Sequence, residues 1–110
     1  MEQAARIDRW ICRRQAPRFR IGMPARLITL EQSFAVTLED LSEGGAKVTL
    51  PVPHVFTACA LHWMDYHAIA EVRWTHGCIA GLQFTSPLFP EMLDETRRYA
   101  PDGVTQVKLR

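Results

Sequence analysis

The chain lacks the long apolar run that a membrane-spanning helix needs, because none of its hydrophobic stretches approaches about 18 residues. Its N-terminus carries Glu2 and Asp8 and has no continuous apolar core of the kind found in secretory signals. The three cysteines, Cys12, Cys59 and Cys78, are odd in number and far apart, which argues against a disulfide framework and fits a reducing compartment. We therefore expect a cytoplasmic protein with no membrane insertion.

The net charge of +1 is small, but it hides an asymmetry along the chain. Residues 1–26 contain seven arginines against two acidic residues, whereas residues 27–110 contain six basic and ten acidic residues. This concentration of positive charge predicts an anionic partner at the N-terminal end, with a solvated basic tail as the alternative. The length of 110 residues and the 47% hydrophobic content are typical of one folded domain.

Most of the chain shows the period-two alternation of half-buried antiparallel strands. The clearest example is residues 34–39, where Phe34, Val36 and Leu38 share one face. Alternating or apolar segments predict six strands, at 24–30, 34–39, 46–50, 57–63, 68–74 and 78–84. Because closure removes exposed strand edges, we predict an all-β fold, a small six-stranded antiparallel barrel.

Two glycine-containing turns join well-patterned strands. In Ser42-Glu43-Gly44-Gly45 the glycines are expected to supply the positive φ of a tight hairpin with a bulge. The segment Thr75-His76-Gly77 is expected to turn the chain between the last two strands. The aromatic side chains of Phe56, Trp63 and Trp74 are predicted to lie in the core rather than on the surface.

A C-terminal helix follows the last predicted strand. Pro90 suits its first turn, and Pro101 ends it. One face should cover the barrel, and its members are Phe89, Met92, Leu93 and Thr96. The predicted organisation is an N-terminal arm with a short helix at 1–12, a barrel at 13–88, and the helix and tail at 89–110.

Two short motifs carry the functional prediction. Arg14 and Arg18 stand four residues apart just before the first predicted strands, and Asp40, Ser42 and Gly45 form a D-x-S-x-x-G pattern in the hairpin turn. In this order the chain resembles the PilZ domain family, the bacterial receptor module for the second messenger cyclic di-GMP. The resemblance implies a nucleotide-binding signalling function, with these five residues contacting the ligand.

Each residue type suits a part of that ligand. Arg14 and Arg18 can present guanidinium donors to phosphate or to the O6/N7 edge of guanine. Ionised Asp40 accepts from guanine N1 and N2, Ser42 can donate or accept, and Gly45 lets the backbone approach closely.

Arg13 precedes the first motif, and an arginine there is associated in the family with two intercalated cyclic di-GMP molecules rather than one. We therefore include Arg13 in the ligand-binding set and expect two ligands per protomer, with no other cofactor and no metal. Pro17 keeps the arm from forming one continuous helix, so we expect ligand binding to order the arm for a downstream protein that the sequence does not identify. The sequence leaves a homodimer open.

Single-stranded nucleic-acid binding is the alternative function. Arginines interleaved with Trp10 and Phe19 on a small barrel resemble what single-strand binders use. Against it, the barrel segment is acidic overall and its strands are not expected to present an outward aromatic platform.

An enzyme and a metal site are both disfavoured. Asp40 and Ser42 have no identifiable histidine partner for nucleophilic catalysis. Cys59-x-x-His62 and His76-x-Cys78 have the wrong spacing for a zinc ribbon, and alternation puts Cys59 and His62 on opposite faces of a strand.

Overall fold

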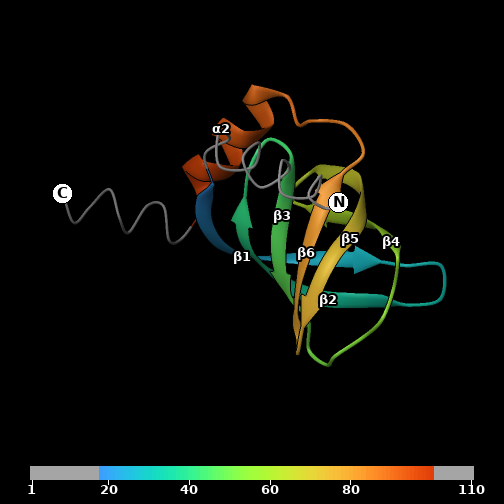
Figure 1. The fold of residues 1–110 in the computed structure, drawn as a ribbon. Coiled ribbons are helices and arrows are strands. Elements are labelled where there is room, and N and C mark those ends of the chain that lie inside the picture. Colours follow the sequence, from blue (N-terminus) through green and yellow to red (C-terminus); the bar gives the residue numbers. More distant parts are fainter. Residues whose placement is uncertain (1–17, 101–110) are drawn as a thin grey trace, which may run out of the picture.

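The computed structural model describes residues 18–100, and these form a closed antiparallel barrel followed by a helix (Figure 1). The elements are β1 (Phe19–Ile28), β2 (Ser33–Leu41), β3 (Gly45–Thr49), β4 (Ala58–Trp63), β5 (Tyr66–His76), β6 (Ile79–Phe84) and α2 (Pro90–Tyr99). The barrel closes in the order β1-β2-β3-β6-β5-β4. The predicted six-stranded barrel with a C-terminal helix is therefore confirmed, while the predicted N-terminal arm and its short helix lie outside the described residues.

Alternating side chains from all six strands fill the barrel. Phe34, Val36 and Leu38 of β2 are buried as predicted, and Val48 of β3 and Leu61 of β4 are fully buried. Burying an aliphatic side chain of this size stabilises the fold by about 1.5–3 kcal/mol relative to leaving it in water.

The first strand begins earlier than the predicted 24–30 and runs over Phe19–Ile28. Ile21, which is fully buried, extends the core to the beginning of this strand. The alternation is hard to see in the sequence because the register against β2 shifts between Arg20 and Met23, where Gly22 adopts a φ of 66°.

Two β-bulges interrupt the alternation on other strands. The register between β2 and β3 shifts between Leu38 and Asp40, and that between β5 and β6 shifts between Val72 and Trp74. A bulge puts an extra residue on one strand and so turns the following side chains to the other face. Trp74 is consequently 40% exposed, so its predicted place in the core is wrong.

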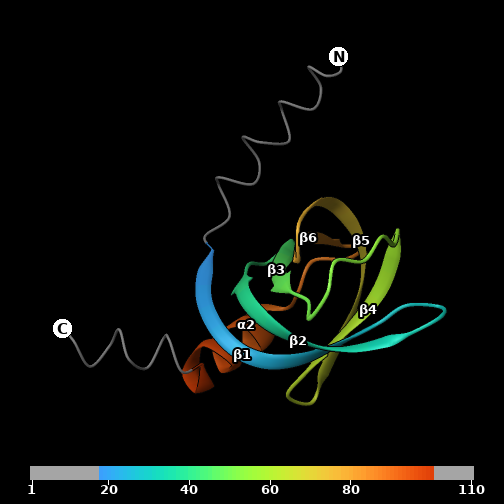
Figure 2. The same ribbon diagram turned by 90° about the horizontal axis from the view of Figure 1, so that it is seen from below.

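The helix α2 packs against the barrel where β1 begins (Figures 1 and 2). Trp63, at the end of β4, is 2% exposed and donates from Nε1 to Thr96 Oγ1 over 2.9 Å. The guanidinium of Arg97 lies 3.8 Å from the centre of the Phe19 ring. The predicted packing of the helix on the barrel is confirmed, except that Phe89 at its N-cap is 71% exposed.

The β1–β2 hairpin and the link between β3 and β4 lie away from α2. The link is attached to the barrel by the Leu50 N–H, which donates to the Cys78 carbonyl over 2.7 Å. The centre of the His54 ring lies 4.8 Å from the centre of the buried Phe34 ring, and Phe56 is partly buried against the core.

Among residues 18–100, no helix has both the length and the apolar character needed to cross a bilayer.

Candidate functional site

The turn between β2 and β3 is rigid because hydrogen bonds join its own residues and also link it to the last residue of β6 and to the chain that follows β6. The Ser42 N–H donates to the Gly45 carbonyl over 2.9 Å, and the Gly45 N–H donates to Ser42 Oγ over 3.2 Å. The Phe84 N–H donates to the Gly44 carbonyl, and the Leu88 N–H donates to the Glu43 carbonyl, each over 2.9 Å. Two of the predicted ligand-binding residues, Ser42 and Gly45, are therefore held in a fixed geometry.

Gly45 is required for a reason other than the predicted one. The glycines of positive φ among the described residues are Gly22 and Gly77, so the expected positive φ in the 42–45 turn is wrong. A Cβ built on Gly45 would instead overlap the carbonyl oxygen of Leu82 on β6. Gly45 thus allows β3 to lie close to β6, and a side chain at this position would push the two strands apart.

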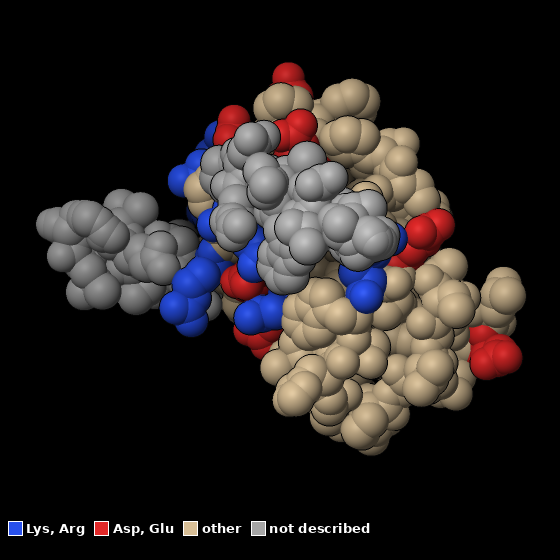
Figure 3. Space-filling model, viewed as in Figure 1, with Lys and Arg blue, Asp and Glu red and all other residues tan. Residues whose placement is uncertain are grey.

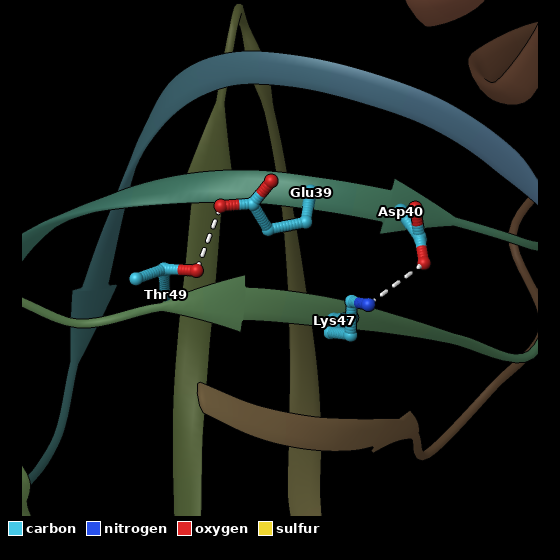
Figure 4. Close-up of polar contacts among 4 residues, drawn as sticks. All are labelled: Glu39, Asp40, Lys47 and Thr49. Atoms are coloured by element: carbon cyan, nitrogen blue, oxygen red, sulfur yellow. Dashed lines mark hydrogen bonds and ion pairs between the residues drawn. The ribbon is translucent and has the colours of Figure 1, made fainter. Parts of the chain in front are cut away.

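Asp40 faces outward because of the β2 bulge. Continuing the alternation of Phe34, Val36 and Leu38 would place Asp40 inside the barrel, but the register shift exposes it partly and returns Leu41 to the core. Its carboxylate lies 3.5 Å from Lys47 Nζ on β3 (Figure 4). The neighbouring Glu39 accepts a 2.7 Å hydrogen bond from Thr49 Oγ1, so the two adjacent carboxylates have different partners.

The strand register aligns Asp40 with residues from four other strands. In the barrel order β1, β2, β3, β6 and β5, each strand contributes one residue that is paired directly with the next. These residues, which we call the outer row, are Arg20, Asp40, Lys47, Gly81 and Trp74. Trp74 lies over Gly81, since a Cβ on that glycine would overlap the indole ring. The outer row therefore offers cations, an acceptor and an aromatic surface on the outside of the barrel.

Sequence reasoning did not identify Arg20, Lys47 or Trp74 as candidate ligand contacts. The sequence pattern predicts Trp74 in the core, and neither motif includes Arg20 or Lys47. A signal was present in the adjacent Glu39 and Asp40, which are followed by the apolar Leu41 and so break the alternation of β2.

Arg18 is exposed and immediately precedes β1. The next residue, Phe19, pairs with Leu41, so the end of the arginine motif meets β2 close to Ser42. The other arginines of the predicted set, Arg13 and Arg14, lie outside the described residues. Lys and Arg side chains gather on the side of the molecule where β1 begins, and the region around the β1–β2 hairpin shows few charged groups (Figure 3).

A shallow hollow of about 190 Å³ lies beside the same turn. Its lining includes Glu43 of the turn, Phe19 of β1, and Leu93 and Arg97 of α2. The beginning of β1, the turn and the helix therefore meet at one place.

Among the cysteine and histidine residues that the structure describes, none assemble as a zinc ribbon would require. Cys59 is buried and His62 is exposed, on opposite faces of β4 as predicted. Burial raises the pKa of the Cys59 thiol to about 11, which disfavours the thiolate that a metal would need. Within residues 18–100, no group of three or more His, Cys, Asp or Glu side chains is placed to hold a metal ion.

A profile of the PilZ domain matches residues 13–100, which include the arginine motif, the barrel and α2. The chain belongs to the PilZ domain family. PilZ domains are cyclic di-GMP-binding modules rather than a family of catalysts. None of the curated proteins compared with the chain matches it.

In this PilZ domain the D-x-S-x-x-G segment spans the end of β2, the turn and the start of β3. Its aspartate belongs to the outer row, and its serine and glycine hold the turn. The Ser42 hydroxyl also donates to the Gly45 carbonyl over 3.3 Å, so it is already engaged within the turn. A hydroxyl has two acceptor lone pairs, and it therefore retains acceptor capacity for a ligand.

Proposed function

We propose that this PilZ domain binds cyclic di-GMP at the outer row and the adjoining 42–45 turn. The observation that carries the proposal is the outward-facing Asp40, beside Lys47 and at the end of β2 that meets Arg18. An ionised carboxylate suits the N1 and N2 donors of guanine, and guanidinium groups suit phosphate or the O6/N7 edge. The exposed part of the Trp74 ring adds a surface on which a purine can stack.

The proposed ligand-binding set is Arg13, Arg14, Arg18, Asp40, Ser42 and Gly45. We propose that the ligand holds the arginine motif against the barrel and thereby presents the N-terminal arm to a partner protein. Arg18 precedes Phe19, whose ring lies under Arg97 of α2, so fixing Arg18 would also constrain the contact between β1 and the helix. The additional guanidinium of Arg13 supports a stoichiometry of two ligands per protomer.

Calorimetric titration of cyclic di-GMP into the full chain tests this function. We expect saturation at two ligands, and Arg14→Ala should weaken binding roughly tenfold or more, because charge-assisted hydrogen bonds contribute about 1.5–3 kcal/mol. Arg26→Ala is the matched control, since Arg26 is an exposed arginine on β1 outside the outer row. Saturation at one ligand would refute the two-ligand stoichiometry, and absence of binding would refute the function.

Hydrogen exchange over residues 6–20 tests the output signal. Saturating cyclic di-GMP should slow exchange there, whereas unchanged exchange with bound ligand would contradict the ordering of the arm. Strongly salt-dependent binding to mixed oligonucleotides, with no response to cyclic di-GMP, would instead favour the nucleic-acid alternative. The outward-facing Trp74 removes one argument against that alternative, but the acidic barrel still opposes it.

A further inference from the structure

Two exposed histidines face each other on the outer wall of the barrel. His62 of β4 and His67 of β5 are direct cross-strand partners. Their ring centres are 5.4 Å apart, and the ring planes are inclined by 34°. They lie on the hairpin that joins β4 and β5, at the other end of β5 from Trp74.

This separation matches the geometry of a chelate. Imidazole nitrogens bind divalent transition metals at about 2.0–2.1 Å. Each nitrogen lies about 1.1 Å from the centre of its ring, so the ring centre lies about 3.2 Å from a bound ion. Two rings bound to one ion then have centres about 4.5 Å apart when the angle at the metal is 90°, and about 6.3 Å apart when it is 180°. The observed separation lies inside that range, so rotation of the two exposed side chains can bring one nitrogen of each ring to the same ion without movement of the strands.

We propose that His62 and His67 form a two-point binding site for a divalent transition metal that favours imidazole, such as Ni²⁺, Cu²⁺ or Zn²⁺. Because no third His, Cys, Asp or Glu joins them within residues 18–100, water completes the coordination. The site is therefore open and exchangeable, unlike a structural zinc site with four protein ligands. It is independent of the proposed cyclic di-GMP site.

The scaffold that carries the pair is fixed on both sides. Trp63, next to His62, bonds to Thr96 of α2, and Tyr66, next to His67, bonds through its hydroxyl to Glu95. Little backbone freedom remains to be lost when the second imidazole binds, so coordination of both nitrogens is favoured over coordination of one.

Two charged side chains flank the histidine pair, and they have opposite effects on the binding of a cation. Arg26 of β1 is the cross-strand neighbour of His62, and its positive charge disfavours a cation. Asp65, in the turn of the same hairpin, supplies a compensating negative charge. Both side chains are exposed, so water and salt screen their effect on the ion.

Calorimetric titration of nickel chloride into the full chain without an affinity tag tests the proposal. We expect one Ni²⁺ per chain, with binding weakened about tenfold or more by either His62→Ala or His67→Ala, because each leaves a single imidazole. His76→Ala is the matched control, since His76 is an exposed histidine of β5 whose cross-strand partner is Ile79. Its Ni²⁺ affinity should equal that of the wild type.

Thermal unfolding supplies a second measurement. Ni²⁺ should raise the Tm of the wild type and of His76→Ala, but not that of the His62→Asn/His67→Asn double variant, because a ligand that binds only the folded state stabilises it. Without metal the double variant should melt like the wild type, since both positions are exposed. No Ni²⁺ binding, binding unchanged in the single variants, or binding abolished by His76→Ala would each overturn the proposal.

Discussion

The indole of Trp74 covers Gly81, the residue that pairs with it on β6, so that a Cβ on Gly81 would overlap the ring. Because Trp74 is 40% exposed, its ring can turn outward without moving the backbone. Gly81→Ala should therefore change the unfolding free energy by less than about 1 kcal/mol while displacing the ring from the outer row. We expect weaker cyclic di-GMP binding by calorimetry, together with a shifted NMR signal of the Trp74 indole N–H. Unchanged affinity with a displaced ring would exclude stacking on Trp74.

Gly45 differs from Gly81 because its close neighbour is backbone. A Cβ on Gly45 overlaps the Leu82 carbonyl oxygen, which can move only with β6. Gly45→Ala should destabilise the fold by about 1–3 kcal/mol, as overpacking does elsewhere, and should lower the urea midpoint. Gly44→Ala is the control, since nothing lies within 4 Å of a Cβ at that position. Equal midpoints for the two variants would contradict a steric role of Gly45.

The barrel was predictable where alternation is unbroken. Phe34, Val36 and Leu38 identify the inner face of β2, and the same pattern places the other strands to within a few residues, apart from the early start of β1. The motif positions of Asp40, Ser42 and Gly45 could also be read from the sequence.

The outward orientation of the site has only one sign in the sequence, the adjacent acidic residues Glu39 and Asp40 before Leu41. It depends on the bulges before Asp40 and Trp74, and a bulge is defined by pairing with another strand rather than by local sequence. The close contact of Gly45 with Leu82 likewise joins residues far apart in the chain. Such contacts exist only after the barrel has closed.

Asp40→Asn should separate ligand recognition from stability. The amide of the variant presents donor hydrogens to guanine N1 and N2, which are also donors. We therefore expect the variant to bind cyclic di-GMP about tenfold more weakly than the wild type, or weaker still. The lost ion pair with Lys47 is partly exposed and should cost at most about 1 kcal/mol in unfolding free energy. Glu39→Gln in the same bulge is the control, and calorimetry should find its ligand affinity unchanged. Equal losses of affinity in both variants would indicate general electrostatics instead of a specific acceptor.

The cysteines should differ in reactivity. Burial raises the pKa of Cys59 to about 11, so at pH 8 very little of this thiol is the reactive thiolate, and the side chain is also shielded. Cys78 is half-buried and should be alkylated by iodoacetamide much faster in a Cys12→Ser background. Peptide mass spectrometry should find Cys59 modified only after urea is added, or as the pH approaches 11. Equal rates at pH 8 in native protein would contradict the burial of Cys59.

The hydroxyl of Thr96 connects α2 to the barrel core. It accepts from Trp63 Nε1 and donates to the Met92 carbonyl over 2.8 Å, and it is fully buried. Thr96→Val keeps the shape but leaves the buried indole N–H without an acceptor, which should lower the unfolding free energy by about 1–3 kcal/mol. Thr85→Val is the control, because its hydroxyl bonds to the Ile69 carbonyl at an exposed position and should cost less than about 1 kcal/mol. If urea unfolding gave the two variants the same stability, the Trp63–Thr96 hydrogen bond would contribute nothing to holding the helix on the barrel.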